Sequence, residues 1–141
     1  MKAKFVLSTL LLVLISTGAY SLVSQKTDEV DKIDVIAVYM YADWCSACQN
    51  IKPKIAKAKR EFENQPILFT KMDMTDDFTT HQSKLLATRI GVLDIFEENE
   101  GKTGFILLVD ADSYEILDKI AADDDIDGMV EKINSTLLSS K

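Results

Sequence analysis

The sequence predicts an α/β fold in which a central mixed sheet of four to five strands is flanked by helices. Three observations carry this prediction. Short apolar runs, typical of buried strands, alternate with longer segments whose apolar residues recur at three- and four-residue steps. The last two apolar runs are separated only by a short acidic turn, which indicates an antiparallel hairpin. The length of 141 residues suits one domain.

The expected strands are the short runs rich in β-branched and aromatic residues. The run 34–41, DVIAVYMY, is almost continuously apolar, as in a strand buried on both faces. Further strands are expected at 67–72, 105–109 and 114–120, and the turn at 110–113 joins the last two. Because helices separate the first strands, we expect these to run parallel, with the hairpin adding an antiparallel edge.

The first expected helix spans 46–64. Its apolar residues recur at helical steps, with lysines on the other face. The repeating positions are Ile51, Ile55, Ala58 and Phe62. A proline-containing break at 64–66 ends the segment.

A second helix is expected at 76–89, with Thr75 or Asp76 as its N-cap. Its apolar side would be formed by Leu85, Leu86 and Ile90.

Two further helices complete the pattern. A short one is expected within 92–100, VLDIFEENE, with Leu93 and Phe96 facing inward and Gly101 ending it. The last is expected at 126–138, behind an acidic cluster that suits the positive end of the helix dipole.

Residues 1–21 are expected to form a secretory signal. Two lysines lie within the first four residues, an apolar run follows at 5–15, and small residues occupy 16–19. This order of charged, apolar and small residues is typical of export signals. We therefore expect an exported protein, periplasmic or otherwise extracytoplasmic and secreted.

Cleavage is expected after Ala19 or Ser21, and residues 22–141 are expected to form the mature domain. The alternative is an uncleaved N-terminal membrane anchor, because the segment 5–23 just reaches the roughly twenty residues that a membrane helix needs.

The domain is acidic. The whole chain has a formal net charge of −7, and removal of the two lysines in the signal makes it −9. This charge argues against nucleic acid or anionic lipid as partners. We expect a monomer.

The stretch VYMYADWCSACQNIKP contains both cysteines of the chain, Cys45 and Cys48. A disulfide between them would close a very small loop and constrain the unfolded chain little, so the spacing favours chemistry over a structural role. Between a strand and a helix, Cys45 would meet unpaired N–H groups and the positive end of the helix dipole, which stabilise a thiolate. We expect Cys45 to attack a substrate disulfide and Cys48 to resolve the mixed disulfide.

No organic cofactor is expected, because the Cys45–Cys48 pair itself carries two electrons. A zinc site is not expected either, since His81 is the one other good ligand and zinc requires three or four. A soft copper(I) site with Met72, Met74 and His81 is an alternative. The plainer interpretation is one core methionine, one surface methionine and a helix histidine.

The segment YADWCSACQNIKP resembles the active-site segment of the thioredoxin family. The matching residues are Tyr41, Ala42, Asp43, Trp44, Cys45, Cys48 and Pro53. The order of elements resembles the family over roughly residues 30–140. The resemblance implies that Trp44 shields the disulfide and contributes to docking, that Pro53 kinks the first helix, and that Lys71 matches a lysine of the second strand.

Four features depart from the family pattern. The residues between the cysteines are Ser46 and Ala47, where thioredoxin has Gly-Pro. Tyr39 occupies the position of a buried aspartate. Thr103, or Gly104 in the other register, stands where the family has a cis-proline, and we expect a trans peptide there. The segment 93–102 resembles an insertion bordering the site.

Together these features predict an exported thioredoxin-like thiol–disulfide oxidoreductase, with a slight preference for a reductase. Its partners would be protein thiols or disulfides and a redox partner protein that recharges the cysteine pair. The alternative is a thioredoxin-fold binding module with a static disulfide or a copper-binding thiol pair.

Overall fold

The computed structural model describes residues 32–140, so the predicted signal at 1–21 and the alternative anchor at 5–23 lie outside the described residues. The strands are β1 (Val35–Tyr41), β2 (Ile67–Asp73), β3 (Phe105–Asp110) and β4 (Ile116–Ala121). The helices are α2 (Ser46–Ala58), the 3-10 helix η1 (Lys59–Phe62), α3 (Asp77–Arg89), α4 (Leu93–Glu98) and α5 (Ile126–Ser139). None of these helices is long and apolar enough to cross a membrane.

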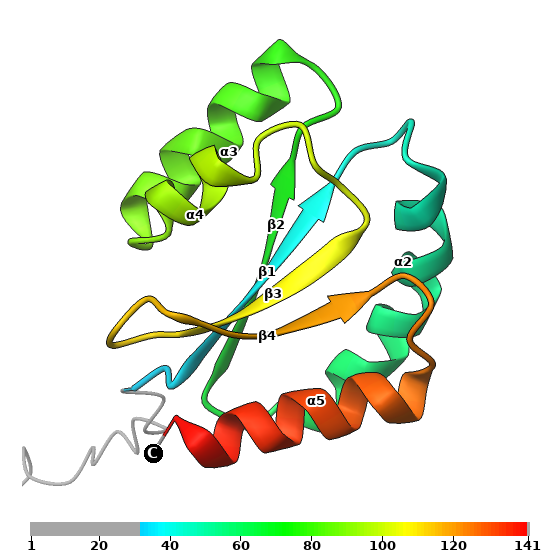
Figure 1. The fold of residues 1–141 in the computed structure, drawn as a ribbon, viewed down its shortest axis with the longest axis vertical. Coiled ribbons are helices and arrows are strands. Elements are labelled where there is room, and N and C mark those ends of the chain that lie inside the picture. Colours follow the sequence, from blue (N-terminus) through cyan, green and yellow to red (C-terminus); the bar gives the residue numbers. More distant parts are fainter. Residues whose placement is uncertain (1–31, 141) are drawn as a thin grey trace, which may run out of the picture.

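The four strands form one mixed sheet in the order β2-β1-β3-β4. β1 and β2 are parallel, whereas β3 is antiparallel to both β1 and β4. Helices α2 and α5 cover one face of the sheet, and α3 and α4 cover the other (Figure 1). The predicted parallel pair and antiparallel hairpin are confirmed.

β1 divides its side chains between two cores, because alternate residues of a strand point to opposite faces. Val35, Ala37 and Tyr39 belong to the core beneath α2 and α5, together with both cysteines. Ile36 and Val38 belong to the core beneath α3 and α4. All seven residues of β1 are buried, as its continuous apolar sequence predicts. This burial fixes the end of β1, from which the cysteine loop departs.

α2 begins where the sequence predicts and buries Ile51, Ile55 and Ala58 against the sheet. Its predicted last turn tightens into η1, which buries Phe62. The helix continues through Pro53, which lies in its interior. Because proline has no N–H, this position interrupts the backbone hydrogen bonds of the helix.

The N-cap of α3 is Asp76, one of the two predicted residues, and it forms a capping box with Thr79. The prediction that Leu85 and Leu86 lie on the buried side of this helix is wrong, because both are exposed. Ser83 and Ala87 face the sheet instead.

The buried position of Ser83 has a specific cause. Its hydroxyl accepts a hydrogen bond from the Asp73 N–H at 2.7 Å and donates one to the Asp73 carbonyl at 2.9 Å. A buried polar group that is satisfied in this way costs little. A small polar residue can therefore take the inner face, and the leucines turn outward.

The short helix α4 forms as predicted, with Phe96 fully buried and Leu93 half-buried. It packs beside α3 (Figure 1), and the Lys84–Glu97 ion pair joins the two helices at 2.5 Å. Gly101 has a φ of +78°, the left-handed conformation that suits a glycine just beyond a helix. The segment expected as an insertion is thus anchored in a core.

α5 begins within the acidic cluster, as predicted. Asp125 is its N-cap and accepts a hydrogen bond from the Gly128 N–H at 2.8 Å. Lys54 of α2 donates to the carbonyls of Ala122 and Asp124 at 2.8 and 2.7 Å. These two bonds tie α2 to the loop between β4 and α5.

Candidate active site

The two cysteines form a disulfide at the first turn of α2, with their Cα atoms 5.2 Å apart. Cys45 is the N-cap of the helix, and its Sγ accepts a hydrogen bond from the Cys48 N–H at 3.0 Å. A hydrogen bond to the sulfur and the positive end of the helix dipole both favour the thiolate over the thiol. The arrangement predicted from the strand–cysteine–helix order is therefore present.

The two cysteines differ slightly in their exposure to solvent. Cys45 is 7% exposed, whereas Cys48 is fully buried. The Cys48 Sγ lies 3.8 Å from the Met40 carbonyl, on the inner side of the loop. This difference fits the predicted roles, in which Cys45 is the outer cysteine that attacks a substrate disulfide and Cys48 is the inner cysteine that resolves the mixed disulfide.

Tyr39 lies behind the disulfide, at the position where the thioredoxin family has a buried aspartate. Its hydroxyl donates to the Cys48 carbonyl at 2.9 Å, and its ring meets Tyr41 edge to face at 5.5 Å. Burial, with a smaller contribution from Tyr41, raises the pKa of Tyr39 to about 12. The hydroxyl therefore stays protonated and keeps donating at neutral pH.

A cavity of about 230 Å³ adjoins Tyr39 between α2 and the sheet. Its walls include Ile55 and Phe69, and its charged residues are Lys52, Lys59 and Lys71. No acidic side chain lines it.

Lys71 does not contact the cysteines in this structure. Its Nζ donates to Asp73 at 2.8 Å and lies 4.5 Å above the Tyr41 ring, with half of its side chain exposed. Burial alone would raise the pKa of Asp73, but hydrogen bonds from Lys71 and Thr75 outweigh burial and lower it. Lys71 therefore acts on the end of β2 and not directly on the disulfide.

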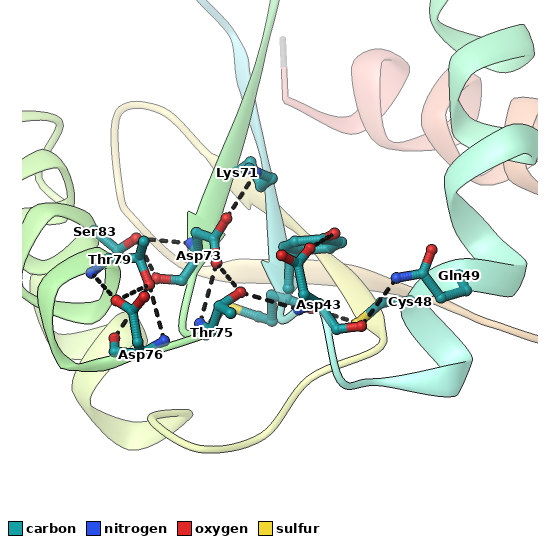
Figure 2. A network of polar contacts seen from close by, with 11 residues as sticks. Asp43, Cys48, Gln49, Lys71, Asp73, Thr75, Asp76, Thr79 and Ser83 are labelled. Carbon is teal, nitrogen blue, oxygen red and sulfur yellow. Dashed lines mark hydrogen bonds and ion pairs between the residues drawn. The ribbon is translucent and has the colours of Figure 1, made fainter.

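A polar network holds the cysteine loop against the end of β2 (Figure 2). The Asp43 N–H donates to the Thr75 Oγ1 at 3.0 Å, and the Thr75 hydroxyl donates to Asp73 at 2.5 Å. Gln49 of α2 donates to the Asp43 carbonyl at 3.1 Å, and Tyr41 donates to the Asp43 carboxylate. The loop is thus tied to β1, to α2 and to the end of β2.

Trp44 projects from this loop and is 62% exposed. Its Nε1 donates to the Thr75 carbonyl at 3.3 Å, which anchors one edge of the ring. An exposed aromatic side chain beside a disulfide is available for contact with another molecule, as the resemblance implies. Ser46 is also exposed and Ala47 is half-buried.

Gly104, one of the two residues predicted for the position of the family's cis-proline, borders the disulfide. A Cβ on Gly104 would lie 3.3 Å from the Cys45 Sγ and 2.6 Å from the Ala47 Cβ. Its φ of +91° also favours glycine. Every peptide bond within residues 32–140 is trans, as expected where the family has a cis-proline.

The residues of the copper alternative are not gathered around the cysteines. Met72 and Met74 are both buried in the core beneath α3 and α4, so the expectation of one surface methionine is wrong. His81 lies on the exposed side of α3. Within the described residues, no three His, Cys, Asp or Glu side chains form a cluster that could hold a metal.

A four-stranded mixed sheet with a Cys-x-x-Cys disulfide at the start of its first described helix defines a thioredoxin-like protein. The thioredoxin family model matches residues 22–121, and this chain belongs to the thioredoxin family. Over 51 residues it is 31% identical to protein disulfide isomerase-like 1-4 of Arabidopsis thaliana. That match covers 36% of this chain and 8% of the Arabidopsis protein, so the chain spans less than a tenth of that relative.

Solved structures with the same fold include a thiol:disulfide interchange protein of the thioredoxin family from Chlorobium tepidum. It has a TM-score of 0.52 at 14% identity, with 74% of this chain and 80% of that chain covered. A candidate protein disulfide isomerase from Bacteroides thetaiotaomicron has a TM-score of 0.51 at 20% identity, with 76% of both chains covered. At these identities the likeness concerns the fold.

Proposed function

We propose that this protein is an exported thiol–disulfide oxidoreductase that exchanges disulfides with other proteins through Cys45 and Cys48. The observation that carries the proposal is the position of Cys45, the more exposed of the two cysteines, at the N-cap of α2 with a hydrogen bond from the Cys48 N–H. Membership of the thioredoxin family supports it. No organic cofactor takes part, because the two thiols supply the electrons.

In the reducing direction, the Cys45 thiolate attacks one sulfur of a substrate disulfide. A mixed disulfide forms, and the other substrate sulfur leaves as a thiolate. The Cys48 thiolate then attacks the Cys45 sulfur, which closes the Cys45–Cys48 disulfide and releases the second substrate thiolate. The substrate gains two electrons, the protein loses two, and the protons of the two cysteines pass through solvent to the released thiolates.

A reductase role is preferred over an oxidase role, because the Asp43-Trp44-Cys45 sequence resembles thioredoxin itself. In that role a redox partner protein would return two electrons to the disulfide after each cycle. We place the protein outside the cytoplasm on the basis of residues 1–21, with an N-terminal anchor at 5–23 as the alternative.

Insulin reduction by the protein, with dithiothreitol as electron donor, tests the activity. We expect the wild type to precipitate insulin chains faster than dithiothreitol alone, and Cys45→Ser to remove this acceleration. Cys48→Ser is the matched variant, because it keeps the attacking thiol and should accumulate a mixed disulfide. If the wild type and Cys45→Ser are equally inert with several donors, the proposal fails.

A second candidate function is a binding module with a static disulfide. Two observations favour it: a neutral phenol, Tyr39, lies where thioredoxin has a buried aspartate, and Gly104 borders the disulfide where the family has a cis-proline. The copper version requires that the reduced protein bind Cu(I) through the thiols. Metal analysis after incubation of the reduced protein with Cu(I) would show one tightly held ion per chain if that version is right.

A further inference from the structure

Among the hydrogen bonds of the described residues, Tyr39 is the one side chain of the sheet that donates to the backbone of the turn carrying Cys48. Its hydroxyl donates to the Cys48 carbonyl at 2.9 Å, and both residues are buried. A buried hydroxyl of this kind acts as a fixed tether. If it is removed, the buried Cys48 carbonyl loses this bond and no water takes its place.

The turn that carries Cys48 has a particular need for a tether. Pro53 lies inside α2 and has no N–H, so the carbonyl of Gln49, four residues earlier, lacks its helical donor. The backbone hydrogen bonds of the helix are therefore interrupted one residue beyond Cys48. A bond from the sheet to the Cys48 carbonyl stabilises the helix beside that interruption.

Cys45 is held in a different way. Its N–H donates to the Ala42 carbonyl at 3.2 Å, and the polar network around Asp43 and Thr75 fixes its loop (Figure 2). None of these bonds involves Tyr39. Tyr39 therefore bonds the turn of Cys48 directly, and it reaches Cys45 only indirectly, through the Cys48 N–H bond to the Cys45 Sγ and through its ring contact with Tyr41.

We propose that Tyr39 is a positioning residue that holds Cys48 in place for closure of the Cys45–Cys48 disulfide. This inference rests on the exchange reaction proposed above. In the step concerned, the Cys48 thiolate attacks the Cys45 sulfur of a mixed disulfide, a new S–S bond forms, and the substrate sulfur leaves as a thiolate with the electron pair. Tyr39 transfers no proton in this step; it fixes the backbone from which the Cys48 side chain extends.

The surroundings of Tyr39 explain why it positions and does not act as a base. The ionisable groups that line the cavity around it are Tyr41, Lys52, Lys59 and Lys71, and none is a carboxylate. Burial raises the pKa of Tyr39 to about 12, so the phenol is neutral in the working range. It therefore serves as a donor throughout the cycle.

The test separates the two chemical steps in the full-length reduced protein, with oxidised glutathione as the probe. Attack by Cys45 is measured in a Cys48→Ser background as formation of the glutathione adduct. Ring closure is measured with both cysteines present, by acid quenching and mass determination of the adduct and the closed disulfide. The variant is Tyr39→Phe, and the matched control is Tyr114→Phe, an exposed tyrosine in the turn before β4.

We expect Tyr39→Phe to leave the attack rate within twofold of the parent and to slow ring closure about three- to tenfold, the range of one neutral hydrogen bond. The equilibrium with glutathione should shift toward the dithiol by the same factor. At about 30 mV per tenfold, this corresponds to about 15 to 30 mV. Tyr114→Phe should change neither step.

Other outcomes contradict the inference in distinguishable ways. If Tyr39→Phe slows both steps equally, its role is structural, and the positioning proposal is overturned. If ring closure is unchanged while urea titration shows the variant folded, the tether has no kinetic role. If wild-type protein forms no adduct with glutathione at all, the exchange reaction itself fails, and this inference fails with it.

Discussion

The two sides of the disulfide are built by different means. On the inner side, Gly104, Ala47 and Tyr39 act through close packing and one neutral hydrogen bond. On the outer side, Asp43, Thr75 and Asp73 act through a network that includes charged groups and reaches solvent (Figure 2). We therefore expect the free energy of unfolding to depend on side-chain volume on the inner side. On the outer side we expect it to depend on hydrogen bonds and on pH.

The largest effect is expected from Gly104→Ala on the inner side. The new Cβ would lie 2.6 Å from the Ala47 Cβ, and the φ of +91° is unfavourable for alanine. Overpacking and backbone strain together should lower the free energy of unfolding by about 2 to 4 kcal/mol. Urea titration of the oxidised protein measures this.

Gly101→Ala is the matched control, because that glycine also has a positive φ but no atom within 4 Å of the added Cβ. It should lose only about 1 kcal/mol, the cost of backbone strain. Equal losses in the two variants would show that the space beside the Cys45 Sγ is not tightly filled.

A smaller effect is expected from Thr75→Val on the outer side. This change keeps the shape of the side chain but removes the hydroxyl bonds to the Asp43 N–H and to Asp73. The free energy of unfolding should fall by about 1 to 2 kcal/mol. The fluorescence of Trp44, the single tryptophan of the chain, should also change, because its loop is released.

Thr88→Val provides the control, since Thr88 is exposed and its hydroxyl contacts only the Lys84 carbonyl within α3. Its stability should stay within about 0.5 kcal/mol of wild type. If Thr75→Val behaves like Thr88→Val, the outer network does not hold the loop.

The smallest effect is the pH dependence at Asp73. Its pKa in the folded protein lies below the ordinary value of 3.8, because hydrogen bonds from Lys71 and Thr75 outweigh burial. The ionised carboxylate therefore adds stability above that ordinary value, and the contribution disappears as the pH falls through the folded pKa. Urea titrations at pH 7 and pH 3 should show the advantage of wild type over Asp73→Asn shrinking at pH 3.

Glu63→Gln, which removes an exposed carboxylate in the turn after η1, controls for the loss of one surface charge. Its difference from wild type should change less between the two pH values. An advantage over Asp73→Asn that grows at pH 3 would have the wrong sign for this account.

The fold could be predicted largely from local pattern. The buried run 35–41 and the helical spacing after Cys45 place β1 and α2 at the right residues, because both elements are specified by side-chain periodicity. The inner face of α3 could not be found in the same way. Whether Ser83 or Leu86 faces the sheet depends on the backbone of Asp73, which lies on another element.

The site was predictable to a similar degree. The cysteine pair and its place before a helix follow from the sequence, whereas two contacts do not. The bond from Tyr39 to the Cys48 carbonyl depends on how α2 lies on β1, and periodicity carries no information on that. Gly104 offered one local signal, a lone glycine directly before a buried strand, which often marks a close approach of backbone to other atoms.

The central claim is that Cys45–Cys48 exchanges with other disulfides, and its reduction potential tests this most directly. Oxidised protein can be equilibrated with glutathione and dithiothreitol buffers, with Trp44 fluorescence or thiol alkylation as the readout. We predict a potential between about −120 and −270 mV, the range of exchanging disulfides in this class of proteins. A potential below about −300 mV would mark a structural disulfide and contradict the account.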